Sequence, residues 1–504
     1  MVKHFESVLE ELSQRKVPTS TEEVTVYTPS FEEHAGSQVV MVKSGTEKMI
    51  VAAGAGELFE ALSGEDIGKG KVCPLTHENR LVLNQFFSYT APQAFGTDIA
   101  TMGLGDRLGI ASPGHIDTVK ERNVKPILAQ QSIRELTLLN RTMTDILDAA
   151  AFAVFQEGYK DGYGADADHI KLESDIEHAL QLGFSFLTLD CSEQIRNDVE
   201  SQTSDEIQNE FASLSDEKRA YFSNYYLDQT FNVHERQISF DQANLAKNVL
   251  VYGEAIDFME HVYHTYLQSL DRDVDFEISI DETETVTSPE AHFFVAEELR
   301  RRGVKVESLA PRFCGEFQKG IDYIGDMDQF EKELKEHADI AKHFGYKLSI
   351  HSGSDKFSVF PIIGKYTDGL LHIKTAGTNW LEAVRVVAQE NPDLYRRMHV
   401  YAEEHFEETL KYYHVTPDLD SVTPLKEQPD DQLPEYMNHD AARQLFHVTY
   451  GILLTAKDDA GNDLFRDEFF DTLLNKEDAY RQALAHHIGR HLDLLGLSKK
   501  VGIE

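Results

Sequence analysis

The stretch KLSIHSGSDK at residues 347–356, followed by LLHIKTAGT at residues 370–378, decides the fold. Each segment is an apolar run that reaches a histidine and then breaks into glycine, serine and threonine. Strands that end in polar residues at a turn build the catalytic mouth of a parallel α/β barrel. A third stretch, GADADHIKLES at 164–174, places Asp168 and His169 at the same kind of position. Three histidine-bearing strand ends, far apart in the sequence, predict a metal site at the top of a barrel.

Outward from these segments, strand and helix patterns alternate, as in a parallel sheet covered by helices. Helices are predicted between the strands, for example at 141–158 and at 328–345, the latter ending at a glycine. Before them, residues 37–45 and 47–56 predict two strands joined by a tight turn. The fold class is therefore α/β, a (β/α)8 TIM-type barrel. Its eight strands are predicted at 107–112, 126–131, 166–171, 184–190, 275–281, 305–312, 347–352 and 370–375.

The chain divides into three predicted parts. Residues 1–103 form an N-terminal α/β region, residues 104–385 the catalytic barrel, and residues 386–504 a helical C-terminal region. A polar, helical insertion at about 194–273 interrupts the barrel. An insertion after a barrel strand can form a lid or wall over the substrate, or contact another copy in a homo-oligomer. The sequence leaves both interpretations open.

Composition excludes several functions. The formal net charge of −39 argues against binding to nucleic acid or to an anionic membrane, because phosphates would be repelled. Residues 1–16 predict an amphipathic helix rather than a signal peptide, and no apolar stretch reaches transmembrane length. Cys73, Cys191 and Cys314 lack metal-finger spacing and fit a reducing compartment. We therefore expect a soluble cytoplasmic protein.

Strand alternation indicates which polar side chains face the barrel interior. In the eighth strand, His372 and Lys374 share one face, and in the seventh, Ser349 and His351 do so. In the fifth strand Glu277 lies on the inward face. A carboxylate inside a barrel is unfavourable unless it is paired or catalytic. Glu277 is therefore a candidate functional residue.

Each candidate also has an ordinary structural explanation. The chain has 22 histidines, and most histidines lie on surfaces or in packing contacts. Position at strand ends favours His169 and His351 as metal ligands. His372 could equally well be a metal ligand or form a hydrogen bond to the substrate. Asp168 can either do chemistry or only orient its neighbour. The HSGSDK stretch, with Ser352 and Lys356, could bind any anion.

The segments GADADHIK, EISIDETE, PRFCGEFQKGIDYIGD and KLSIHSGSDKFSVFPIIGKYTDGLLHIKTAGTNWLEAVRVVA resemble the tagaturonate epimerase family. Members of that family interconvert D-tagaturonate and D-fructuronate in bacterial hexuronate breakdown. The resemblance covers most of the chain. At a greater distance the same segments resemble metal-dependent class II aldolases. The implied substrate is a small uronate.

The family resemblance implies roles for individual residues. It suggests Asp168 as general base, Glu277 as general acid, and His169 and His351 as metal ligands. The third ligand is Gln318 by the resemblance, with Glu316 and His372 as alternatives. The implied cofactor is a divalent cation, with Zn, Mn, Co, Ni and Fe all open.

The uronate carboxylate requires a cation. The candidates are Arg312, Lys319, Lys356 and Lys374, of which arginine binds a carboxylate best because it can do so in bidentate fashion. Ser352 and His372 are further candidates for hydrogen bonds to the substrate.

The two uronates differ at a carbon one removed from the α-position of the ketone, where a hydrogen is not acidified. Hydride removal and return would need a tightly bound nicotinamide, and no G-x-G-x-x-G opens a helix after a strand here. We therefore predict neither a nicotinamide nor a flavin. Retro-aldol cleavage and re-closure needs a Lewis acid and an acid/base pair, which agrees with the residues above.

Two other functions compete with the epimerase. The first is a class II-type sugar aldolase that releases its fragments, although such enzymes usually act on phosphorylated sugars. The second is a non-catalytic, aldolase-like subunit, which should have lost its ligands. Asp168, His169, Glu277 and His351 are all present, which favours an enzyme.

Overall fold

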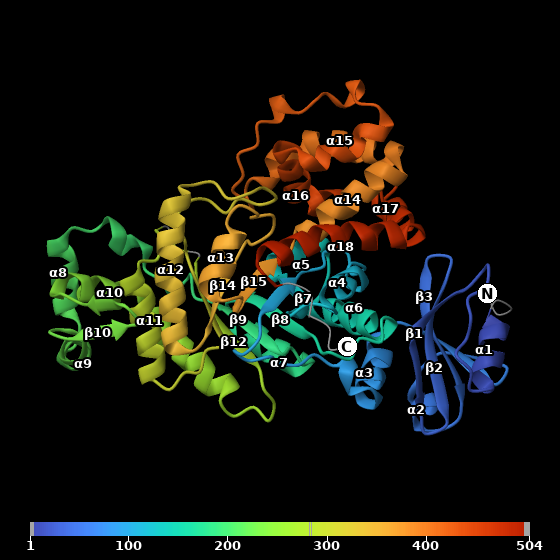
Figure 1. Cartoon of the computed structure of the whole chain (residues 1–504), viewed down its shortest axis with the longest axis horizontal. Coiled ribbons are helices and arrows are strands. Elements are labelled where there is room, and N and C mark those ends of the chain that lie inside the picture. Colours follow the sequence, from blue (N-terminus) through green and yellow to red (C-terminus); the bar gives the residue numbers. More distant parts are fainter. Residues whose placement is uncertain (1–4, 282, 284, 498–504) are drawn as a thin grey trace.

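The computed structural model of the protein describes residues 5–281, 283 and 285–497. Its centre is a closed barrel of eight parallel strands, and chain order runs once around it (Figure 1). The predicted (β/α)8 fold is confirmed. The strands are β6 (Thr101–Leu104), β7 (Lys125–Ser132), β8 (Gly164–Ile170), β9 (Phe186–Asp190), β12 (Asp275–Ile280), β13 (Ser308–Pro311), β14 (Lys347–Ile350) and β15 (Leu371–Thr375).

The prediction of the first barrel strand is wrong. Residues 107–112 form a loop that leads into a helix, and the strand lies earlier, at β6. The carboxylate of Asp106 accepts hydrogen bonds from the backbone N–H groups of Leu108, Gly109 and Ala111. These bonds occupy donors that a strand would need, so a local turn replaces the ladder. The other seven predicted strands overlap observed ones.

Helices cover the outside of the barrel and follow its strands in the chain. The two helices predicted at 141–158 and 328–345 are confirmed. The first begins with a capping box of Thr142 and Asp145, and the second ends at Gly345, whose φ is +79°. The barrel helices are α4 (Ser112–Val119), α5 (Ile133–Leu139), α6 (Met143–Gln156), α7 (Glu173–Leu182), α10 (Gln242–Val262), α11 (Pro289–Arg301), α12 (Met327–Phe344), α13 (Phe360–Thr367) and α14 (Thr378–Glu390).

An antiparallel sheet precedes the barrel, with strand order β1-β2-β3-β5-β4. Its predicted hairpin is confirmed, since Ser44 pairs with Glu47. One face packs on α1, and the other packs on Phe152 and Phe155 of α6, which attaches the sheet to the barrel. The elements are α1 (Glu6–Ser13), β1 (Thr25–His34), β2 (Ser37–Ser44), β3 (Glu47–Gly54), α2 (Glu57–Ala61), β4 (Glu65–Ile67), β5 (Gly70–Pro74), α3 (His77–Phe86) and η2 (Ser88–Thr90).

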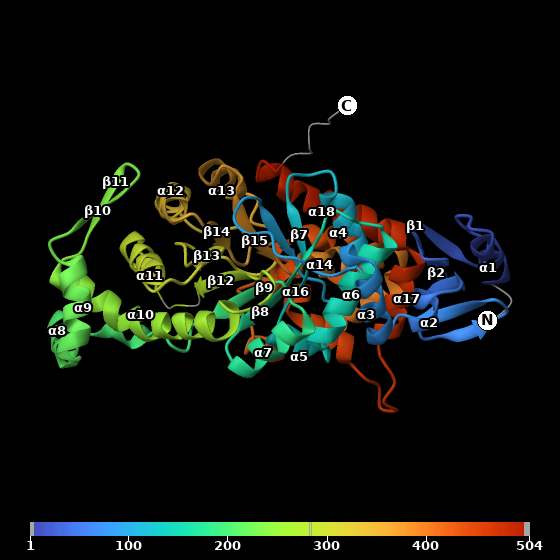
Figure 2. The same ribbon diagram turned by 90° about the horizontal axis from the view of Figure 1, so that it is seen from below.

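The stretch between β9 and β12 extends to the end of the molecule opposite the N-terminal sheet (Figures 1 and 2). It contains a two-stranded hairpin besides the expected helices. Aromatic rings of Phe222, Tyr226 and Phe231 pack it against Phe293 and Phe294 of α11. Its elements are η3 (Asn197–Ser201), α8 (Ser204–Ser213), α9 (Asp216–Tyr226), β10 (Thr230–Val233), β11 (Arg236–Ser239), α10 and η4 (Tyr263–Leu267).

The C-terminal region is helical, as predicted, and lies beside the barrel with its own apolar core around Trp380 (Figure 1). Its last helix, α18, returns to pack on α4 and α14 of the barrel. In the described part of the chain, no helix has both the length and the apolar character needed to cross a membrane. The elements are α15 (Pro392–His405), η5 (Phe406–Thr409), η6 (Leu419–Ser421), η7 (Leu425–Glu427), η8 (Asp430–Asn438), α16 (Asp440–Thr455), α17 (Arg466–Asn475) and α18 (Glu477–Leu494).

Candidate active site

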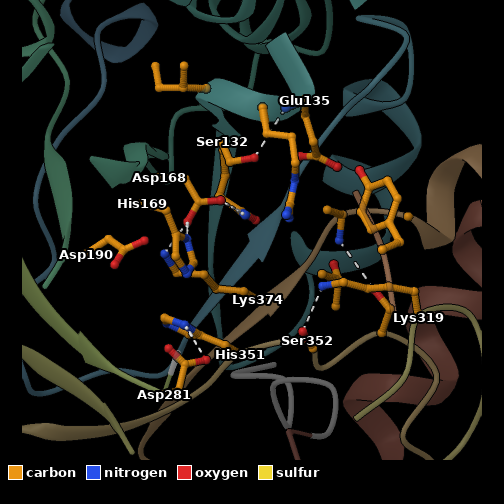
Figure 3. Close-up of a pocket in the computed structure, with 18 of the residues that line it drawn as sticks. Ser132, Glu135, Asp168, His169, Asp190, Asp281, Lys319, His351, Ser352 and Lys374 are labelled. Carbon is orange, nitrogen blue, oxygen red and sulfur yellow. Dashed lines mark hydrogen bonds and ion pairs between the residues drawn. The ribbon is translucent and has the colours of Figure 1, made fainter. Parts of the chain in front are cut away.

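A cavity of about 440 Å³ opens at the carboxyl ends of the barrel strands (Figure 3). This is the face on which barrel enzymes place their active sites. Among the described residues, none from the 194–273 insertion lines the cavity, so the insertion forms no wall here. Tyr413 and His447 of the C-terminal region contribute to the wall instead. The polar residues that line it include Arg107, Gln130, Asp168, His169, Lys171, Asp190, Asp281, Lys319, His351, Ser352, Lys356 and Lys374.

Two of the predicted ligands come together at this mouth. His169, His351 and Asp281 each offer one ligand atom, and these atoms lie within 4.8 Å of one another. The two imidazole rings are 4.9 Å apart between centroids (Figure 3). Nδ1 of His351 is buried and lies 3.2 Å from Oδ2 of Asp281. Two imidazoles and a carboxylate are a donor set typical of divalent transition metals.

A local irregularity at the end of β8 aims two adjacent side chains at the mouth. Strand alternation alone would turn Asp168 and His169 to opposite faces. The pairing of β8 with β9 shifts register between Ala167 and Ile170, and His169 has a φ of +56°. A non-glycine residue in this region is uncommon and is often found at functional sites. Nδ1 of His169 lies 2.7 Å from Oδ1 of Asp168, which fixes the orientation of the ring.

Lys374 is the centre of a buried cluster of carboxylates. Its ammonium lies 2.7 Å from Asp166, 2.7 Å from Asp168 and 3.1 Å from Glu277, and it also contacts Thr188. Burial alone would lower the pKa of Lys374, but these carboxylates raise it, so the side chain is a cation. Burial alone would raise the pKa of Asp168. Lys374 and His169 outweigh this effect and hold the pKa of that carboxyl well below its usual range. Asp168 is thus ionised at the wall of the cavity.

Glu277 lies beneath His351 rather than at the wall. It is fully buried and is not among the residues that line the cavity. Its Oε1 is 2.7 Å from Nε2 of His351, and its Oε2 accepts a hydrogen bond from Ser308. Burial favours the neutral acid, but Lys374 and His351 hold the pKa of Glu277 well below the usual range. An ionised, enclosed carboxylate does not have the form of the predicted general acid, and its contacts are those of a group that orients His351.

Glu277 and Asp281 together set the charge of His351. Burial would lower the pKa of this histidine, yet Asp281 and Glu277 raise it to about 10. The carboxylates on either side of the ring therefore attract positive charge. A divalent cation can supply that charge at the same place when it binds the ring nitrogen.

Three predicted binding residues lie elsewhere. The Gln318 amide oxygen accepts hydrogen bonds from Thr416 and Gln444 of the C-terminal region, and Gln318 does not line the cavity. Its amide nitrogen donates to Glu316, the alternative third ligand, which is also absent from the wall. Arg312 is absent from it as well, and its backbone pairs with Thr287. The conformation of the long loop after β13 decides these positions, and strand periodicity carries no information about it.

His372 faces the barrel interior, as predicted, but below the cavity. Its Nδ1 lies 2.8 Å from Thr101 Oγ1, and its Nε2 lies 4.0 Å from Glu277 Oε2. Burial is the main reason that the pKa of His372 falls to about 3, and the charge of Lys374 lowers it further. Glu277 acts in the opposite direction but is outweighed. The prediction that His372 binds substrate or metal is therefore not supported by its position, since it does not line the cavity.

Lys319, Ser352 and Lys356, which the sequence predicts to bind substrate, line the cavity. Lys319 donates a hydrogen bond of 2.8 Å to Ser352, whose φ of +53° belongs to the tight turn after β14. The Lys356 ammonium instead donates to the backbone carbonyls of Gln318, Ile321 and Ser354. Lys356 thus holds two active-site loops together, and only Lys319 of this pair is placed to meet a ligand.

Sequence reasoning missed several wall residues. Asp281 carried a signal, because it lies on the inward face of the fifth strand with Glu277. No sequence signal pointed to Arg107 or His447. Arg107 lies in the stretch that was predicted as a strand, and His447 lies on a helix of the C-terminal region.

A second cluster of possible ligands lies outside the cavity wall. Asp355, His487 and His491 bring ligand atoms within 4.8 Å of one another. Nε2 of His491, however, accepts a hydrogen bond from the backbone N–H of Asp355, and the Asp355 carboxylate pairs with His487 and Arg443. These contacts tie α18 to the loop that follows β14. They leave no ligand role for His491.

Comparison with known proteins gives long and close matches. The model of the tagaturonate epimerase family, UxaE, matches residues 27–495. The tagaturonate/fructuronate epimerase of Thermotoga maritima is 42% identical over 476 residues, covering 93% of this chain and 96% of that protein. Two crystal structures of the fructuronate-tagaturonate epimerase UxaE from Cohnella laeviribosi, one native and one with glycerol, each superpose with a TM-score of 0.93 at 57% identity. Each covers 98% of this chain and 99% of its own, so the likeness includes both regions that flank the barrel.

Proposed function

This chain belongs to the tagaturonate epimerase family and is an isomerase, and we propose that it interconverts D-tagaturonate and D-fructuronate at the mouth of its barrel with the aid of a divalent metal ion. The single observation that carries this proposal is that the ionised Asp168 adjoins the group of His169, His351 and Asp281 in one cavity. A base beside a metal site is what cleavage and re-formation of a carbon–carbon bond requires.

His169, His351 and Asp281 would hold the ion. The fit is supported by the chemistry of the donors and by the buried Nδ1 of His351, which lies 3.2 Å from Oδ2 of Asp281. When bound, a divalent cation supplies Lewis acidity worth several kcal/mol toward developing negative charge. Asp281 replaces Gln318 as the third ligand in this proposal. Zinc, manganese, cobalt, nickel and iron all suit such a donor set.

The reaction inverts the carbon that is β to the ketone. The bond between this carbon and the α-carbon breaks, and its electron pair stays with the ketone fragment as an enediolate. The hydroxyl on the β-carbon becomes an aldehyde and loses its proton. After the aldehyde turns its other face to the enediolate, the same bond re-forms and the hydroxyl regains a proton, so that no atom is lost.

Asp168 is the group that accepts this proton. It is ionised, lies at the wall, and has its second oxygen hydrogen-bonded to Gln130 at 3.0 Å. Lys374 forms ion pairs with both Asp168 and Glu277, so the three side chains form a continuous charged network. We propose that the proton stays among these three side chains and returns to the new hydroxyl. Glu277 acts through His351 and Lys374 rather than by touching substrate.

The cell compartment and assembly complete the proposal. Cys73, Cys191 and Cys314 are buried free thiols, which suits the reducing conditions of the cytoplasm. The insertion between β9 and β12, which lies away from the cavity, remains our candidate for contacts within a homo-oligomer.

The activity is tested by incubating the purified protein with D-tagaturonate and following the products by NMR. We expect D-fructuronate alone, at the equilibrium ratio of the two epimers, and we expect chelation to abolish turnover and a divalent ion to restore it. Accumulation of two three-carbon products would identify an aldolase instead. Unchanged turnover after chelation, with no metal left in the protein, would contradict the metal site.

A further inference from the structure

His447 enters the cavity from the C-terminal region. It lies on α16, is only 1% exposed and lines the wall beside Lys319 and Gly320. Its ring lies directly over Gly377, where an added Cβ would fall 1.9 Å from the ring carbon Cε1. Glycine at 377 therefore makes room for this histidine at the turn after β15.

Arg107 fixes the tautomer of His447. Nη2 of Arg107 lies 3.4 Å from Nε2 of His447, and a guanidinium can only donate. Nε2 is therefore the acceptor, and the ring hydrogen is on Nδ1. Burial, with help from Arg107 and Lys319, keeps the pKa of His447 well below its usual value, so the ring is neutral. Among the described residues, none accepts a hydrogen bond from Nδ1 although the atom is buried. An unused donor of this kind is unfavourable unless a ligand pairs with it.

Two groups near Nδ1 carry positive charge, while the Asp355 carboxylate accepts a hydrogen bond from Thr378 at the first residue of α14. The 13-residue helix α14 begins at Thr378, directly after Gly377, and no described side chain caps it. The amino end of a helix carries partial positive charge and free N–H groups. The ammonium of Lys319 lies on the same side of the cavity as Ser352, to which it donates (Figure 3).

Three other cations of the described wall have carboxylate partners. Arg107 lies 2.7 Å from Glu135, and Lys171 lies 3.4 Å from Asp190. Lys374 is surrounded by carboxylates. Asp190 and Asp281 lie on the far side of the cavity from Lys319 in Figure 3, so a carboxylate bound there would be repelled.

We infer that Nδ1–H of His447, the ammonium of Lys319 and the start of α14 together bind the carboxylate of the uronate substrate. This inference rests on the proposed function. The carboxylate belongs to the aldehyde fragment, so the same contacts would retain that fragment while its aldehyde turns. His447 would then distinguish uronates from neutral ketohexoses.

Two substitutions separate this role from structural support. His447→Gln places an amide near the position of Nε2, where it can still accept from Arg107, but removes the donor at Nδ1. His447→Asn places an amide N–H near the position of Nδ1. We would measure dissociation constants by calorimetry for D-tagaturonate and for D-tagatose, which has a hydroxymethyl group in place of the carboxylate, on the metal-loaded full-length protein.

We expect His447→Gln to weaken D-tagaturonate binding by about 10-fold to 100-fold while D-tagatose binding changes by less than about threefold, because a hydrogen bond to a charged group is lost. His447→Asn should regain most of the difference. His439→Gln, on the same C-terminal segment but outside the cavity, is the matched control and should leave both constants unchanged. Equal weakening of both sugars by His447→Gln, or no weakening of either, would overturn the inference. A wild-type protein that prefers D-tagaturonate but forms no D-fructuronate would overturn the proposed function and leave the carboxylate site standing.

Discussion

Replacing His169 or His351 by alanine is expected to lower turnover of D-tagaturonate by about 10³-fold and to remove the bound metal. Each change deletes one of the imidazoles that meet at the cavity wall. Several kcal/mol of stabilisation are lost with the ion. Turnover by NMR and metal content by mass spectrometry, measured on the same preparations, check the prediction.

The control is His178→Ala, on the exposed face of α7 in the same βα unit as His169. It should match the wild type in turnover and metal content. If either ligand variant retains half of its turnover with metal content unchanged, the site is wrongly assigned. Asp281→Ala and Gln318→Ala identify the third ligand, since the structure predicts metal loss in the first and retention in the second.

Asp168→Asn is expected to lower turnover by at least about 10²-fold while the metal stays bound. Asparagine preserves the shape and the contact with Gln130, but an amide cannot accept the hydroxyl proton. Comparison with Glu177→Gln, an exposed carboxylate change on α7, controls for the loss of one negative charge. Full activity of Asp168→Asn would exclude Asp168 as the base.

Glu277→Gln separates two roles in the same assay. If Glu277 orients His351, as its buried position indicates, metal affinity should fall by about 10-fold to 100-fold and excess metal should restore turnover. Loss of turnover at full metal occupancy would instead support the general acid that the family resemblance suggested.

The sequence was sufficient to predict the barrel because the information is local. Apolar runs that end in His351, in His372 and in the Asp168–His169 pair mark strand ends, and parallel strands present those ends at one face. Inward alternation also predicted correctly that Glu277 and Lys374 face the barrel interior. Strand one was misplaced because the alternating RLGIAS stretch looks like a strand, whereas the Asp106 carboxylate turns it into a loop.

Features that depend on distant contacts could not be predicted. The register shift in β8 lets Asp168 and His169 both reach the mouth, and periodicity cannot reveal it. The Gln318 amide is held by Thr416 and Gln444, which lie 98 and 126 residues later in the chain. His447 likewise reaches the cavity only because the C-terminal helices fold over the barrel.

Substrate deuterated at the inverted carbon tests the central claim most directly, because only the carbon–carbon bond breaks and re-forms in the proposed reaction. Epimerisation of this substrate in ordinary water should give D-fructuronate with the label fully retained and only a small isotope effect. The unlabelled substrate in deuterated water should gain no deuterium at that carbon. Loss of the label to solvent at the rate of epimerisation, or a primary isotope effect of several-fold, would contradict the retro-aldol account.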